Sequence, residues 1–173
     1  MLVAMSVLAV VTLFFVVFMF RPFISKGHSI SRVAYINRSQ REVWMLISDI
    51  GGQDSWRLDL ETVERLEQKN WLELWSETDI GGQTLIWETI KSIPQQILDR
   101  RVVDITGKYV CRWVCEVAEF GDVTSLTITQ EKEMNSFGMR FISTVLSDPY
   151  EAIDRYIHLV GRGFDAHVTI TTD

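Results

Sequence analysis

Aromatic and charged side chains recur at every second position in the middle of the chain. This spacing places side chains on one face of a β-strand. Aromatic rings on such a face give a large, rigid contact surface for an apolar ligand, and a buried carboxylate or guanidinium among them would act as an acid, a base or a polar anchor. The candidates for lining a ligand cavity are Trp75, Glu77, Trp87, Arg101, Trp113, Cys115 and, on a later helix, Tyr156.

The sequence leaves open which face of each strand points inward, because both faces are partly apolar. In one interpretation the tryptophans line a cavity, and a buried charge such as Glu77 or Arg101 marks a site. In the other, the tryptophans are ordinary core residues, and Glu77, Glu88 and Arg101 lie on the solvent face of the sheet.

Several kinds of site are excluded by residue spacing. Cys111 and Cys115 are four residues apart on one predicted strand, so their Cα atoms lie roughly 13 Å apart and cannot form a disulfide. We expect them to be buried, reduced thiols. The three histidines are scattered, the glycine pairs lack a phosphate-binding motif, and no nucleophile stands beside a base. The sequence therefore predicts no metal and no cofactor.

The charge balance excludes another class of partner. Residues 27–173 carry 15 of the 17 basic residues and all 23 acidic ones, so their formal net charge is −8. Nucleic-acid binding needs clustered Lys and Arg to neutralise phosphates. We expect no nucleic-acid partner.

The first part of the chain predicts a membrane anchor over residues 1–22. Residues 1–20 include 18 apolar residues and no charge, and twenty helical residues span about 30 Å. A cleaved signal peptide is the alternative, but it would have a basic start and a shorter apolar run. Basic residues follow the span, so the positive-inside rule places the remainder in the cytoplasm. Residues 23–27 form a short connector.

The elements that must position the candidate residues are mostly strands. Ser39, followed three residues later by Glu42, predicts a capping box that opens a short helix ending at Gly51-Gly52. Period-two patterns separated by turn residues predict an antiparallel meander after it. The predicted strands are 29–36, 62–67, 71–78, 83–92, 97–105, 109–118 and 123–133.

A long helix is predicted near the end of the chain. Asp148-Pro149 is a suitable helix start, and an apolar stripe follows at helical spacing. A shorter helix is expected over 139–146, and residues 166–173 are expected to be a frayed tail. The stripe comprises Ile153, Tyr156, Ile157, Val160 and Phe164.

The order of these elements and their residues resembles the START-like superfamily, also called SRPBCC, which has the helix-grip fold of polyketide cyclase/dehydrase-like and Bet v 1-like proteins. The resemblance covers residues 28–165. It implies an α+β fold in which a curved antiparallel sheet of about seven strands surrounds a long C-terminal helix, here preceded by one transmembrane helix. It is carried by Ile36-Asn37-Arg38-Ser39, Glu42-Val43-Trp44, Asp49-Ile50, Ser55-Trp56, Trp75-Ser76-Glu77, Gly81-Gly82, Ile93-Pro94, the segment 112–117, Thr127-Ile128-Thr129 and Asp154-Arg155-Tyr156.

The function expected from this resemblance is binding of a lipid or another apolar small molecule in an internal cavity. The domain would be held at the membrane as a single-pass protein. Two alternatives stay open. One is a cyclase, dehydratase or hydrolase that uses Glu77 with Arg101, and the other is a structural or interaction domain whose cavity is filled.

Overall fold

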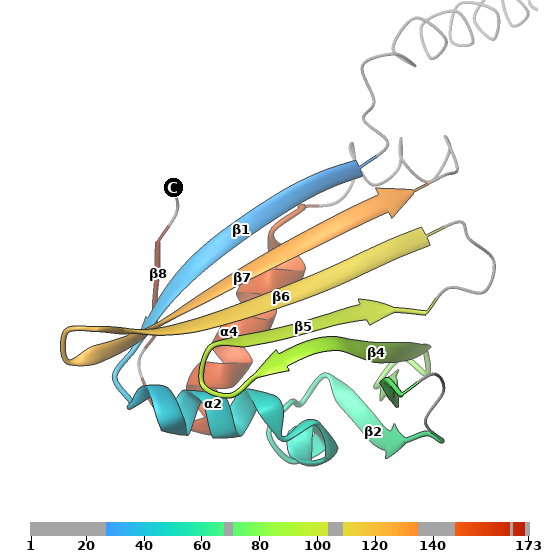
Figure 1. Ribbon diagram of the computed structural model, residues 1–173, viewed down its shortest axis with the longest axis horizontal. Coiled ribbons are helices and arrows are strands. Elements are labelled where there is room, and N and C mark those ends of the chain that lie inside the picture. Colours follow the sequence, from blue (N-terminus) through green and yellow to red (C-terminus); the bar gives the residue numbers. More distant parts are fainter. Residues whose placement is uncertain (1–26, 68–70, 104–108, 135–147, 167, 172–173) are drawn as a thin grey trace, which may run out of the picture.

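The computed structural model describes residues 27–67, 71–103, 109–134, 148–166 and 168–171, which form one antiparallel sheet, two α-helices and a short 3-10 helix (Figure 1). In chain order the elements are β1 (Gly27–Ile36), α2 (Gln40–Ser48), the 3-10 helix η2 (Ile50–Ser55), β2 (Leu60–Arg65), β3 (Glu73–Asp79), β4 (Thr84–Ile93), β5 (Ile97–Val102), β6 (Tyr109–Phe120), β7 (Val123–Met134), α4 (Glu151–Gly163) and β8 (Val168–Thr171).

The sheet is a meander whose open end is extended by the first and last strands. Its order is β2-β3-β4-β5-β6-β7-β1-β8, and every neighbouring pair is antiparallel. The curved strands pass in front of α4 in Figure 1, with α2 beneath them. The prediction of a curved antiparallel sheet packed on a long C-terminal helix is confirmed.

The eighth strand corrects the expectation that residues 166–173 fray. Val168–Thr171 pairs with residues 33–36 of β1, and Val168 and Ile170 pack against the core. The chain can approach α4 closely here because Gly161 has no side chain: a Cβ at that position would lie 2.5 Å from a methyl carbon of Val168. Alternation of Val and Ile with Thr suits a strand with one buried face.

Helix α2 begins as its sequence predicts. The Ser39 side chain accepts a hydrogen bond from the Glu42 backbone N–H, and the Glu42 side chain accepts one from the Ser39 backbone N–H. The helix ends at Ser48, earlier than the predicted Gly51-Gly52. The Gln53 amide, almost fully buried, donates to the Ile47 carbonyl over 3.0 Å. This bond satisfies a terminal carbonyl of α2 and lets the chain continue as η2.

Helix α4 buries the predicted stripe. Ile153, Ile157 and Val160 are fully buried against the sheet, and Tyr156 is 8% exposed. The helix starts at Glu151, three residues after Asp148. Asp148 instead accepts a hydrogen bond from the Tyr150 backbone N–H over 2.9 Å and stabilises the turn before the helix.

Two predicted helices cannot be compared with the structure. The membrane anchor at residues 1–22 and the short helix at residues 139–146 lie outside the described residues. Across the ranges that are described, no helix is both long enough and apolar enough to cross a bilayer.

Candidate functional site

A cavity of about 150 Å³ lies between the middle strands of the sheet and the first half of α4. Strands β3 to β6 form one wall, α4 forms another, and η2 with the loop after it closes one side. The lining residues are Gln53, Arg57, Asp59, Glu77, Trp87, Leu98, Arg100, Trp113, Cys115, Ala152, Arg155 and Tyr156.

Three aromatic rings line the cavity: Trp87 on β4, Trp113 on β6 and Tyr156 on α4. Trp113 and Tyr156 meet edge to face, with ring centroids 5.5 Å apart and planes at 72°. Trp56, which is outside the lining, contacts Tyr156 with a centroid distance of 6.0 Å. Edge-to-face packing of this kind holds rings in fixed orientations, so the wall has a defined shape.

One carboxylate joins two arginines inside this apolar wall. The two oxygens of Glu77 accept hydrogen bonds from Nη1 of Arg57 over 3.1 Å and Nη1 of Arg100 over 2.6 Å. The side chains of Glu77 and Arg100 are 5% and 9% exposed. Charges buried this deeply require partners, and each oxygen of Glu77 has one.

Arg57 is held by further groups. Its Nε and Nη2 donate to the two carboxylate oxygens of Asp59 over 3.2 and 2.9 Å, and its Nη1 also donates to Gln53 over 3.0 Å. Burial lowers the pKa of the Arg57 guanidinium, but the bond to Asp59 and the charge of Glu77 outweigh burial, and the net shift of the pKa is upward. Arg57 is therefore a fixed cation.

Two further titratable groups of the wall keep their protons. Burial raises the pKa of the Cys115 thiol to about 12 and also raises the pKa of the Tyr156 hydroxyl. Neither group loses its proton near neutral pH. Cys115 therefore acts as an apolar wall residue and not as a nucleophile, because the thiolate is the reactive form.

The cavity brings together five of the seven candidates from the sequence. These five come from three strands and one helix, and they are Glu77, Trp87, Trp113, Cys115 and Tyr156.

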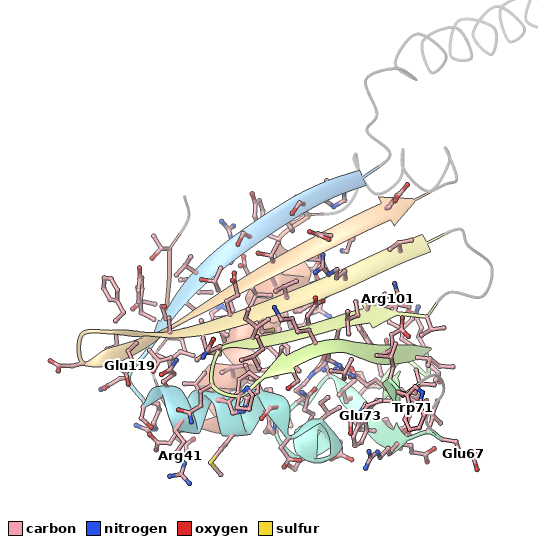
Figure 2. All side chains as sticks on the ribbon, in the orientation of Figure 1. Arg41, Glu67, Trp71, Glu73, Arg101 and Glu119 are labelled. Atoms are coloured by element: carbon pink, nitrogen blue, oxygen red, sulfur yellow. The ribbon has the colours of Figure 1, made fainter. Side chains whose placement is uncertain are left out.

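Arg101 does not lie in the cavity, which corrects the expectation. Its side chain is 52% exposed and pairs with Glu88, the residue opposite it on β4; Figure 2 labels it near the end of β5. Neighbouring residues on a strand face opposite sides, so Arg100 points inward and Arg101 points outward. Glu88 and Arg101 therefore occupy the outer face, as the alternative interpretation expected for them.

Trp75 does not line the cavity, which corrects the expectation, although it is opposite Trp87 in the sheet. A Cβ on Gly51 would lie 3.3 Å from its ring, so the ring packs on η2. The guanidinium carbon of Arg65 lies 5.8 Å from the centroid of the Trp75 ring. Trp75 therefore packs between η2 and Arg65 and not against the cavity.

The sequence interpretation missed all three arginines that line the cavity, which are Arg57, Arg100 and the exposed Arg155, the partner of Glu151. Arg100 had a signal: Leu98, Arg100 and Val102 alternate, and a strand that buries Leu98 and Val102 also turns Arg100 inward. Arg57 lies in an irregular loop with no periodic pattern. Its role follows only from the tertiary contacts that bring it to Glu77.

Among the described residues, no group of three or more His, Cys, Asp or Glu side chains is arranged to hold a metal ion. The polar part of the cavity includes guanidinium, carboxylate and amide groups, and those of Gln53, Asp59 and Glu77 all bond to Arg57. Its chemistry is that of hydrogen bonding and charge.

Comparison with known proteins shows likeness in structure alone. No family model matches the sequence, and no curated protein matches it at a significant level.

Solved structures share the fold. The di-domain aromatase/cyclase StfQ from the steffimycin biosynthetic pathway matches with a TM-score of 0.64 and 6% identity, over 80% of this chain and 50% of StfQ. Truncated norcoclaurine synthase from Thalictrum flavum matches with a TM-score of 0.63 and 10% identity, over 82% of this chain and 95% of the synthase. Ara h 8.0201 matches with a TM-score of 0.61 and 7% identity, over 80% of this chain and 99% of its own. The chain spans about half of the di-domain protein. These likenesses establish the helix-grip fold.

Proposed function

We propose that this protein is a binding module that holds a small, ring-containing molecule in the cavity between the sheet and α4. The observation that carries the proposal is the cavity itself, with Trp87, Trp113 and Tyr156 in its lining. Flat, rigid rings give a ligand large contact area and lose little rotamer freedom on binding. The solved structures with this fold support a cavity-binding module.

The volume of the cavity favours a small apolar molecule over a lipid, the two kinds of ligand expected from the sequence. A cavity of about 150 Å³ accommodates benzene in an engineered protein, and this one has the same volume. A sterol or a long acyl chain would need a much larger space. We therefore propose a single-ring compound in place of the lipid.

The bonding of Glu77 favours binding over catalysis. Each of its oxygens accepts from a guanidinium group, so its place in the structure is that of a fixed partner for two arginines. Arg101, its partner in the enzyme hypothesis, lies on the other face of the sheet. A filled, purely structural cavity is disfavoured by the space between the aromatic rings.

Binding of benzyl alcohol tests the proposal. In an NMR titration of the full-length chain, it should shift the indole resonances of Trp87 and Trp113. Ala152, on α4, lines the cavity. Its replacement, Ala152→Phe, puts a ring into the cavity and should weaken binding at least about tenfold, equivalent to about 1.4 kcal/mol.

Matched controls separate a cavity effect from a general one. Ala118→Phe makes the same change on an exposed position of β6 and should leave binding unchanged. The indole of Trp71 is 95% exposed and should not shift. If benzyl alcohol shifts no cavity resonance up to its solubility limit, or if the well-folded Ala152→Phe variant binds it equally well, the proposal is wrong.

We propose in addition that residues 1–22 anchor the protein in a membrane, with residues 23–27 as connector and the domain on the cytoplasmic side. The apolar run and the basic residues after it support this arrangement. Strand β1 begins at Gly27, so the connector would leave the domain close to the bilayer. The intact mass of membrane-extracted protein should include residues 1–26, and protease outside sealed cells should not digest the domain. Loss of residues 1–26 or digestion of the domain would contradict the anchor.

A further inference from the structure

Arg100 has buried hydrogen-bond donors that no residue in the described part of the chain accepts. Its side chain lies on β5 in the wall of the cavity and is 9% exposed. Nη1 donates to Glu77, whereas Nε and Nη2 are buried and have no hydrogen-bond partner. Leaving buried donors of a charged group unpaired is costly. Such a group calls for a partner that the protein chain does not provide.

The other arginines show which partner suits that edge of the guanidinium. In Arg57, Nε and Nη2 hold the two oxygens of Asp59. In Arg112, the same two nitrogens hold the two oxygens of Asp99 over 2.9 and 2.7 Å. Two parallel N–H groups fit the two oxygens of a carboxylate, and the bonds are strengthened by charge. In Arg100 this edge has no carboxylate and is buried from solvent, so a ligand reaches it by displacing a neighbouring side chain.

The surroundings of Arg100 keep that edge in place. Its guanidinium carbon lies 5.3 Å from the centroid of the Trp87 ring, and Glu77 fixes its Nη1. Glu77 does not bond to that edge: one of its oxygens accepts from Nη1 of Arg100 and the other from Arg57. A planar cation held against an aromatic face attracts an anion.

We infer that the natural ligand is an aromatic carboxylic acid, whose ring occupies the space among Trp87, Trp113 and Tyr156 and whose carboxylate accepts from Nε and Nη2 of Arg100. The inference rests on the proposed cavity-binding function and adds the charged group of the ligand. One ring with one carboxylate matches both the cavity volume and the open donor pair.

The test compares benzoate with benzyl alcohol, which has a similar ring but no charge. Calorimetric titration of the full-length chain at pH 7 should show that benzoate binds at least about tenfold more tightly, the effect of a charge-assisted bidentate pair. Arg100→Met should remove most of that preference. Arg100→Lys keeps the charge but loses the paired donors, so it should weaken benzoate binding more than it weakens benzyl alcohol binding.

Arg101→Met is the matched control, because it removes a guanidinium from the adjacent, outward-facing position; benzoate binding should not change. If benzyl alcohol binds and benzoate binds no better, or if Arg100→Lys binds benzoate like the wild type, the carboxylate inference is overturned and the cavity function stands. If neither compound binds, both proposals fail. If Arg100→Met does not fold, Arg100→Lys and the comparison of the two compounds on the wild type still decide the matter.

Discussion

Replacing Glu77 with alanine is expected to lower the free energy of unfolding by roughly 3–5 kcal/mol, the cost of breaking a buried ion pair by removing one partner. Glu77 is 5% exposed and is the only acceptor that the structure gives to Arg100 within the described residues. Without it, the Arg100 guanidinium is a buried cation with no hydrogen-bond partner. Arg57 is less affected because it retains Asp59.

Denaturant unfolding of the full-length chain, followed by tryptophan fluorescence, measures this effect. Glu73→Ala is the matched control, since Glu73 is also a glutamate of β3 paired with an arginine, but Glu73 is 43% exposed and its partner Arg65 is 54% exposed. It should cost at most about 1 kcal/mol, as for surface pairs. Equal losses for Glu77→Ala and Glu73→Ala would mean that Glu77 is not the centre of a buried cluster.

Replacing Ile157 with alanine is expected to cost roughly 2–5 kcal/mol, the range for removing a large aliphatic side chain from a core. Ile157 is 0% exposed and belongs to the core between α4 and the sheet. The rings and strands around it cannot collapse fully into the space, because each is held by other contacts. The loss combines the apolar surface returned to water with the void left behind.

Chemical unfolding of the full-length chain also measures the cost of Ile157→Ala, and the adjacent residue, His158, supplies the control. His158 is exposed on the same helix, so His158→Ala should change the free energy of unfolding by less than about 0.5 kcal/mol. A cost for Ile157→Ala within that same range would show that the stripe of α4 does not pack on the sheet.

Much of the fold followed from local patterns. The capping box at Ser39 and Glu42 predicted the start of α2, and the apolar stripe of α4 predicted its buried face. Each of these patterns lies within a few turns of one helix, so it can be recognised from neighbouring residues in the sequence alone. The tail was mispredicted because Val168–Thr171 becomes a strand only by pairing with β1, more than 130 residues away in the chain.

For the candidate site, too, local patterns predicted one part and tertiary packing determined the other. Residue types and period-two spacing determined by themselves that tryptophans and charges would lie on strand faces, and Trp87, Trp113 and Glu77 do line the cavity. Only the tertiary structure decided that Arg100 points inward and Arg101 outward, because a shift of one residue reverses the face of a strand. Only it brought Arg57 to Glu77, since a loop side chain gains its partner through the packing of distant segments. The sequence thus specified the chemical groups of this protein, and long-range packing determined which of them share a cavity.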